Sequence, residues 1–272
     1  MIRKAAVAGY FYPASLDAIE AVINGFITEN TLPVHAMGAV VPHAGYRYSG
    51  PVATKVYQRL KVADSVILAG PNHCAVRGIA PPPGAAIMSD GVWELPGGGV
   101  HVDDELAGLL TRETDILEEA PWSHDPEHSL EVQIPFLQYF NKSFKIVPMI
   151  IWNLSDKTIM ELASAISRGI TKFGKPVTMI ASTDFSHYIP HETAKRLDAM
   201  AIEKIKAMDG LGLLKVVRDK KITMCGYQPT ALVIETLKLL GATKAELVDY
   251  KTSGDTSGDY TSVVGYGGLI IS

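Results

Sequence analysis

The sequence predicts an α/β fold in a single domain, with a central, mainly parallel or mixed sheet and helices on both of its faces. Short apolar runs of strand length recur along the 272 residues, and stretches with the 3.6-residue period of an amphipathic helix separate them. The hydrophobic fraction of 47% with 20% charged residues is typical of a globular protein with a sizeable core. Since α/β domains often reach this length, one domain over residues 1–272 is expected.

The first third of the chain predicts one βα unit and a long excursion. Residues 16–28 have apolar side chains at helical spacing. Residues 36–42 and 65–70 are apolar runs that predict buried strands, and a helix over about 50–60 joins them. From 75 to 99 the chain is rich in Pro and Gly, which predicts a partly β excursion at the end of the sheet where functional loops gather.

The remainder continues the alternation of helices and strands. Helices are predicted over residues 103–113, 129–140, 156–172, 190–208 and 226–240, with a short one near 211–218. Strands are predicted over residues 145–151, 177–182, 245–250 and 262–271. This alternation indicates a parallel or mixed sheet covered on both faces.

Composition narrows the class of protein. A formal net charge of -4 gives no basic surface for nucleic acid and no cationic face for a membrane. No apolar run is long enough to span a bilayer, and the amino-terminal apolar run is too broken for a signal peptide. With two cysteines, Cys74 and Cys225, no disulfide scaffold is indicated, and a cytoplasmic protein is expected.

Two histidines follow directly on predicted central strands. His43 ends the run at 36–42, and His73 follows the run at 65–70. Open α/β sheets bind ligands at the carboxyl ends of their strands, and imidazole is the commonest metal ligand. The pattern therefore suggests a metal site, while a pair of capping or buried hydrogen-bonded histidines is the alternative.

A third strand end carries an acid and an imidazole, Asp184 and His187. The two residues are candidates for a general acid/base whose pKa depends on burial and on the carboxylate, or for a metal ligand with its supporting partner. The alternative is a turn in which Asp184 and Ser186 cap the helix that begins near Pro190.

Cys225 precedes a predicted helix and follows Lys220-Lys221. A helix amino terminus and nearby cations both favour thiolate, the form that binds metal or attacks a substrate. Cys74 has no such surroundings and is expected to be a small buried hydrophobic residue.

Several other polar residues are placed at the predicted site. His128 and Glu131 lie where the helix at 129–140 begins and are expected at the rim or at the helix start, because Pro126 opposes a helical His124/His128 pair. Substrate-pocket residues are expected to be Tyr46, His128, Glu131 and Asp255. The aromatic cluster at residues 10–13 is assigned to core packing.

Seven motifs in order resemble the MEMO family. They are Gly9-Tyr10-Phe11-Tyr12-Pro13, Pro42-His43-Ala44-Gly45-Tyr46, Gly70-Pro71-Asn72-His73, Glu127-His128-Ser129-Leu130-Glu131, Asp184-Phe185-Ser186-His187-Tyr188, Cys225-Gly226 and the stretch from Ser253-Gly254-Asp255 to Gly265-Tyr266. The resemblance covers essentially the whole chain. It implies a fold similar to the LigB-like class III extradiol dioxygenases and a functional link to AMMECR1-like and radical SAM proteins.

The resemblance also implies roles for individual residues. His43, His73 and Cys225 match metal-binding positions, and His187, with Asp184 beside it, matches the acid/base of the dioxygenases. Cysteine in place of a carboxylate favours iron with altered redox properties, or copper or zinc. We therefore expect redox or oxygenase-like chemistry on a small substrate, with a zinc-type hydrolase using His187 or Glu131 as base, or a non-catalytic adaptor for peptides or small anions, as alternatives.

Overall fold

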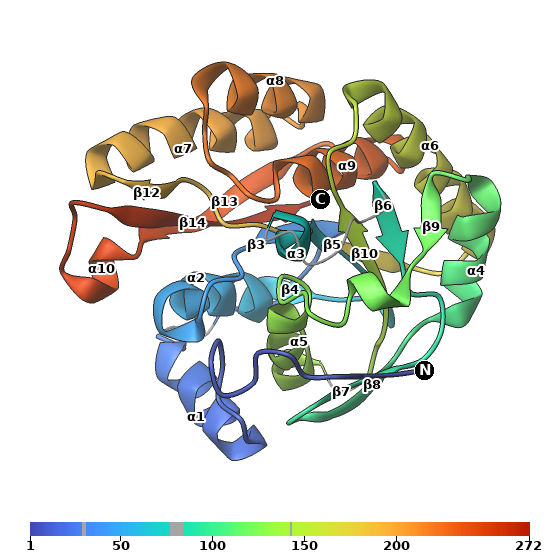
Figure 1. Ribbon diagram of the computed structural model, residues 1–272, viewed down its shortest axis with the longest axis horizontal. Coiled ribbons are helices and arrows are strands. Elements are labelled where there is room, and N and C mark those ends of the chain that lie inside the picture. Colours follow the sequence, from blue (N-terminus) through green and yellow to red (C-terminus); the bar gives the residue numbers. More distant parts are fainter. Residues whose placement is uncertain (29–30, 77–83, 142) are drawn as a thin grey trace.

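The computed structural model describes residues 1–28, 31–76, 84–141 and 143–272, and they form one α/β domain around a large mixed sheet (Figure 1). Along the sheet the strands follow the order β12 (His187–Ile189), β14 (Val263–Ile271), β3 (Gly38–Val41), β11 (Val177–Ser182), β5 (Ser65–Pro71), β10 (Lys145–Ile151), β6 (Ala85–Ile87) and β9 (Leu117–Glu119). A further strand, β13 (Ala245–Thr252), pairs with β14. The four strands from β3 to β10 are parallel, and their neighbours β14 and β6 run antiparallel to them.

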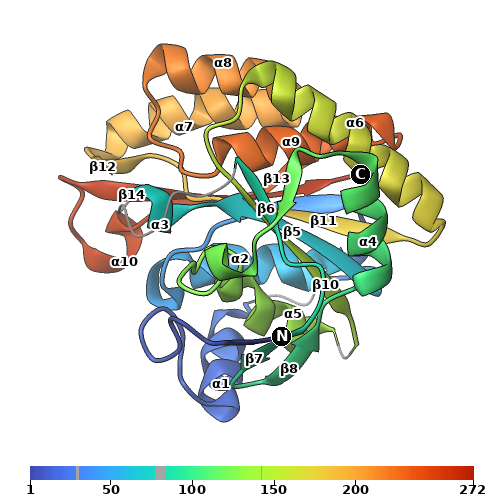
Figure 2. The ribbon, with the colours of Figure 1, turned by 45° about the vertical axis from the view of Figure 1, so that its right-hand side comes forward.

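Helices cover both faces of this sheet (Figures 1 and 2). On one side lie α4 (Asp104–Glu113), α6 (Asp156–Phe173), α7 (His191–Lys206), α8 (Gly210–Lys220) and α9 (Tyr227–Leu239). On the other side lie α1 (Leu16–Phe26), α2 (Tyr46–Arg59) and α5 (Ile134–Phe140). The predicted fold class is therefore confirmed.

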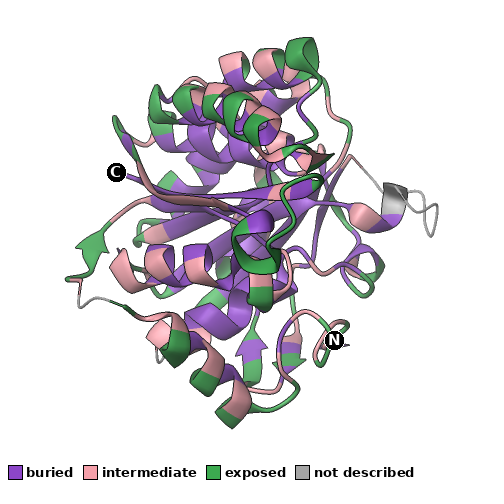
Figure 3. Cartoon of the chain, turned by 90° about the vertical axis from the view of Figure 1, so that its left-hand side faces the viewer, coloured by how far each residue is buried: buried purple, intermediate pink, exposed green. Residues whose placement is uncertain are grey.

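The two-sided core follows from the pleat of the strands. In β5, Ile67 and Ala69 face the cluster built with α6 and α9, whereas Val66 and Leu68 face the cluster built with α1 and α2. Successive strand residues point to opposite faces, so a strand buried on both sides needs a continuous apolar run. All seven residues of β5 are buried, and Figure 3 shows the same for the centre of the sheet.

The predicted strands agree with the structure to within two residues, and the differences lie in the connections. The helix expected over 50–60 begins earlier, at Tyr46, immediately after the loop that carries His43. The helix expected over 129–140 is a 3-10 turn, η2 (Glu131–Gln133), followed by α5. A second 3-10 turn, η1 (Pro121–Ser123), and the short helices α3 (His73–Val76) and α10 (Gly254–Ser257) complete the helical elements of the described residues.

The expected excursion at 75–99 divides into two parts, and its residues 77–83 lie outside the described chain. Its first strand, β6, joins the main sheet beside β10. The hairpin of β7 (Val92–Leu95) and β8 (Gly98–His101) forms a separate small sheet with β1 (Ile2–Lys4). Two further short strands, β2 (Val34–His35) and β4 (Leu60–Lys61), pair with each other.

One residue beside the site has an unfavourable backbone conformation. Tyr188 lies in the left-handed region with φ of 58°, where β-carbon clashes disfavour every residue except glycine. The register between β12 and β14 shifts at this point, since His187 pairs with Val264 and Ile189 with Val263. This β-bulge turns Tyr188 outward, and the residue is 78% exposed.

None of the helices in the described part of the chain combines the length and the apolar character needed to cross a bilayer.

Candidate metal centre

Three neighbouring parallel strands deliver the polar residues of the site to one edge of the sheet. β3 is followed by His43, β5 by His73 and β11 by Asp184, and β11 lies between the other two. The carboxyl ends of parallel strands meet at one edge, so these side chains are brought together by the topology. We expected these residues to share a site because each follows a buried strand, and the strand order brings the three strand ends side by side.

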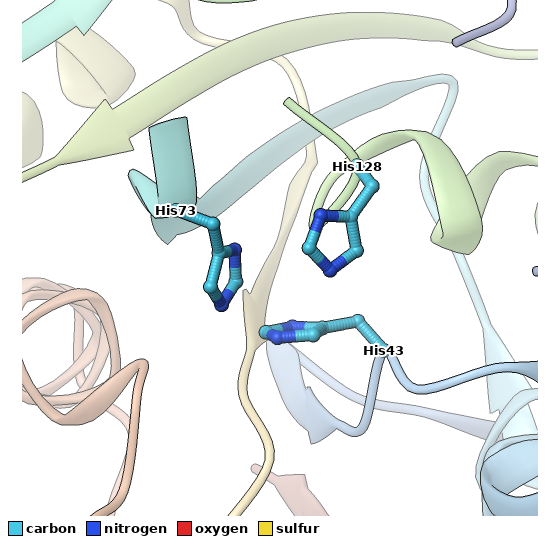
Figure 4. A group of neighbouring side chains, drawn as sticks. All are labelled: His43, His73 and His128. Atoms are coloured by element: carbon cyan, nitrogen blue, oxygen red, sulfur yellow. The ribbon is translucent and has the colours of Figure 1, made fainter. Parts of the chain in front are cut away.

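A third imidazole, from His128, joins the pair (Figure 4). The ring centroids lie 5.0 Å apart for His43 and His73, 5.5 Å for His43 and His128, and 4.5 Å for His73 and His128. One ring nitrogen of each lies within 4.8 Å of the other two. His43 is 2% exposed, and the other two are partly buried. We had expected His128 in the pocket but not among the candidate ligands.

Cys225 lies against this cluster, just before α9. Its Sγ is 3.3 Å from Nε2 of His43 and accepts the backbone N–H of Asp184 at 3.3 Å. Burial raises the pKa of the Cys225 thiol, but the imidazoles of His43 and His73 outweigh it and lower the pKa to about 6. The expected thiolate character therefore comes from the imidazoles, while the lysines at 220–221 are exposed at the end of α8.

Glu127 accepts hydrogen bonds from two residues of the histidine cluster, His73 and His128, and the sequence alone predicted no role for it. Its carboxylate accepts Nδ1–H of His73 at 2.9 Å and the backbone N–H groups of His128 and Ser129 at 2.9 and 2.8 Å. Burial lowers the pKa of His73, but its hydrogen bonds with Cys225 and Glu127 raise it to about 10. A metal ion would have to displace that proton, because only neutral imidazole is a ligand.

The Asp184 carboxylate fixes the turn that carries His43. Its Oδ1 accepts the backbone N–H of His43 at 2.8 Å and that of the following residue at 3.3 Å. Burial raises the pKa of Asp184, against the opposing effect of His187. Ser186 donates to Asp198 on α7. The alternative in which Asp184 and Ser186 cap the next helix is thus not what the structure shows.

His187, the first residue of β12, is half-buried. Its Nδ1 lies 2.8 Å from the backbone carbonyl of Thr223, and its backbone N–H donates to the hydroxyl of the same threonine at 2.6 Å. A carbonyl oxygen only accepts, so Nδ1 carries a proton and Nε2 is the ring nitrogen left to exchange one. Asp184 and His187 thus have separate hydrogen-bond partners.

An aromatic cavity of about 710 Å³ is lined in part by Phe11, which contacts His128. The Phe11 ring lies 4.5 Å from the His128 ring. The cavity is lined by residues 9–13, Ala21, Val22, Gly25, Phe26 and residues 45–48. The core assignment of residues 10–13 therefore holds for Tyr12, which is 3% exposed, but Tyr10 is 90% exposed and Phe11 shapes a pocket.

The other expected pocket residues, Tyr46, Glu131 and Asp255, lie in three different parts of the structure. Tyr46 lines the aromatic cavity. Glu131 is 0% exposed and lies in the interior rather than at the rim, where it pairs with Arg3 at 2.6 Å. Asp255 is exposed on α10 and accepts the backbone N–H of Thr252.

Comparisons with known proteins show the family to which the chain belongs. The family model of Memo-like proteins matches residues 3–270. A MEMO1 family protein of Methanothermobacter thermautotrophicus is 41% identical over 282 aligned residues, which cover 99% of this chain and 100% of that protein. One from Methanopyrus kandleri is 39% identical, with 99% of each chain covered.

A solved structure supports the fold alone. An uncharacterized protein from Escherichia coli K12 matches with a TM-score of 0.58 at 12% sequence identity, over 86% of this chain and 98% of that one. From the family model and the two archaeal relatives, the chain belongs to the Memo-like protein family.

Proposed function

We propose that the pocket binds one transition-metal ion through His43, His73 and Cys225, and that it carries out redox or oxygenase-like chemistry on a small substrate. Iron is the metal we expect first, with copper and zinc as alternatives. The observation that carries the proposal is the convergence of three imidazoles within 4.8 Å beside a cysteine sulfur.

The donor set fits such an ion. Metal–nitrogen and metal–sulfur bonds to a zinc-sized ion are about 2.0–2.3 Å long, so two ligands of one ion lie roughly 3–4 Å apart. The 3.3 Å between Cys225 Sγ and His43 Nε2 lies in that range. The lowered pKa of the Cys225 thiol, about 6, supplies the thiolate that a soft site needs.

Three protein ligands would leave a position open for a substrate, whereas a fourth closes a tetrahedral site. We assign the open arrangement and place His128 beside it as a pocket residue, because its ring packs on Phe11 at the wall of the aromatic cavity. A small, partly aromatic organic molecule fits a cavity of about 710 Å³ with this lining.

In this proposal, residues of the chain serve as the acid/base and as the support of the metal ligands. Iron or copper would supply redox capacity when bound, and zinc would supply Lewis acidity. His187 is assigned as the acid/base, since its Nδ1 is held by the Thr223 carbonyl and its Nε2 is available for a proton. Asp184 holds the His43 turn in place through two backbone N–H groups.

The test is metal analysis of protein purified without oxygen under reducing conditions. We expect about one ion per chain, and His43→Ala and Cys225→Ser should each abolish loading. His101→Ala, on the exposed end of β8, is the matched control and should load normally. Full metal retention in both site variants contradicts the proposal.

A zinc-dependent hydrolase is the second candidate, and the thiolate favours it, because a softer ligand shifts the preference toward zinc. Hydrolase screening of the zinc-loaded protein with oxygen excluded separates the two. Turnover under those conditions supports the hydrolase, and turnover that needs oxygen and iron or copper supports the first function. His187→Gln should abolish either activity while the ion is retained.

A further inference from the structure

We infer that Ser182, Gln133 and Tyr57 are positioning residues that decide which ring nitrogen of His43 faces the metal centre. The inference rests on the proposed metal binding and concerns the regulation of ligand geometry in that site. It starts from the hydrogen bonds of a single hydroxyl group behind His43.

The Ser182 hydroxyl has three polar neighbours. Its Oγ lies 2.6 Å from the backbone carbonyl of Ser129, 2.7 Å from Nε2 of Gln133 and 2.9 Å from Nδ1 of His43. A hydroxyl has one proton to donate and two lone pairs to accept with. A carbonyl only accepts, so the Ser182 hydroxyl donates its proton to the backbone carbonyl of Ser129.

The side-chain amide of Gln133 has one allowed orientation. Its nitrogen also donates to the carbonyl of Pro42 at 3.0 Å, and its oxygen accepts the Tyr57 hydroxyl at 2.9 Å. Turning the amide around would place its oxygen against the Pro42 carbonyl, which has no proton to share. Burial raises the pKa of Tyr57 well above its usual value, so the phenol remains a donor.

These assignments leave one role for the imidazole. Gln133 fills one lone pair of the Ser182 hydroxyl, and the second accepts from Nδ1 of His43, so Nδ1 carries a proton. Nε2 is then the ring nitrogen that can give up its proton to a metal ion, and Nε2 is the atom that lies 3.3 Å from Cys225 Sγ. The arrangement sets the ligand nitrogen before any ion binds.

The hydrogen bonds that connect Tyr57, Gln133, Ser182 and His43 are buried, so breaking them is unfavourable. Ser182 and Gln133 are 0% exposed, Tyr57 is 1% and His43 is 2% exposed. A buried donor or acceptor that loses its partner is destabilised, so moving the proton away from Nδ1 is unfavourable both at the ring and at the hydroxyl. His73 is oriented differently, since the charged carboxylate of Glu127 accepts its Nδ1–H.

The experiment reads the tautomer directly. Two-bond ¹H–¹⁵N correlation spectra of the protein with zinc added, which binds only a deprotonated ring nitrogen, distinguish the nitrogen of His43 that keeps its proton. The signal is assigned by its loss in His43→Gln. We expect Nδ1–H in the wild type and a substantial Nε2–H population in Ser182→Ala.

Zinc affinity of the same proteins gives a second readout. Partners of a metal-bound histidine typically contribute 10–100-fold in metal affinity, so Ser182→Ala should raise the zinc Kd by about that factor. Tyr57→Phe removes only the hydrogen bond from Tyr57 to Gln133, which does not touch Ser182 or His43, and should raise the zinc Kd by less than about tenfold. Thr178→Val removes a buried hydroxyl from the other end of β11, where it accepts the N–H of Ala63, and should leave both tautomer and Kd unchanged.

The outcomes separate this inference from the proposed function. Zinc binding by a wild type that carries the proton on Nε2 of His43, or an unchanged tautomer in Ser182→Ala, overturns the positioning role and leaves metal binding intact. If the wild type binds no metal but carries the proton on Nδ1 of His43, the positioning role of Ser182 is supported and the proposed metal binding is contradicted. The wild-type spectrum decides even where Ser182→Ala does not fold.

Discussion

His124 should make the stability of this protein strongly dependent on pH, and replacing it should remove that dependence. The residue is 0% exposed, and neither ring nitrogen has a hydrogen-bond partner within the described chain. Burial lowers the pKa of His124 to about 3, with a further contribution from the Arg3 guanidinium. The change we consider is His124→Phe, which keeps an aromatic ring beside Trp93 and removes both nitrogens.

The magnitude follows from linkage between protonation and folding. The pKa of histidine is about 6.5 in an unfolded chain and is depressed in the folded protein. The unfolded state therefore binds the proton first, and stability is lost as the pH falls from about 6.5 toward 3. Each pH unit in this window costs about 1.4 kcal/mol, so this residue alone should remove about 2 kcal/mol between pH 8 and pH 5.

Urea unfolding of both proteins at pH 8 and pH 5 measures the effect. Other groups titrate in the same range, but they are common to the wild type and the variant and cancel in the difference. We expect the wild type to lose about 2 kcal/mol more than His124→Phe on acidification. His101→Gln, at an exposed histidine, should behave like the wild type. Equal losses in the wild type and His124→Phe would refute the assignment of His124 as a neutral buried residue.

Three further predictions concern strain, a buried ion pair and the support of the metal site. Tyr188→Gly should leave stability within about 1 kcal/mol of the wild type in thermal unfolding, whereas Tyr188→Val should lower it by about 1–3 kcal/mol, because φ is 58°. Glu131→Gln leaves the Arg3 charge buried without its partner and should cost about 3–5 kcal/mol by urea unfolding. Glu127→Gln weakens the support of His73 and should raise the zinc Kd about 10–100-fold.

Each of these has a result that would contradict it. Equal melting temperatures for the Gly and Val variants would show that the backbone at residue 188 relaxes without cost. Glu161→Gln, which removes only a surface pair with Lys157, is the exposed control. If Glu131→Gln is as stable as this control, the buried pair of Arg3 and Glu131 does not stabilise the fold. Unchanged zinc affinity in Glu127→Gln would mean that His73 needs no carboxylate.

The strand ends were predictable from the sequence because their chemistry is local. An apolar run that stops on a polar residue indicates where a buried strand ends, and β3, β5 and β11 each follow that pattern. The fold class then places those ends at one edge. This much of the site, with His43, His73 and Asp184 meeting, required only the order of the strands.

The third imidazole was not predictable as a candidate ligand because long-range contacts place it. His128 lies on a loop between two 3-10 turns, where no periodic pattern exists. Arg3 fixes this loop by donating to the carbonyls of His124 and Glu127, far away in the sequence. The surroundings of Cys225 were likewise only partly predictable: the helix start and Lys220-Lys221 were expected to favour its thiolate, whereas the lowering of its pKa comes from His43 and His73, which follow β3 and β5.

The position of β3 has a consequence for when the proposed metal site can form. Ala39, on the strand before His43, is paired with Ile180 on one side and Ile270 on the other. Such distant pairings form slowly, and the second needs the last strand to be synthesised. We expect a nascent chain to expose its histidines and cysteines separately until β14 has been synthesised and has paired with β3. A metal ion at the proposed site should therefore bind after this sheet has formed rather than guide its folding.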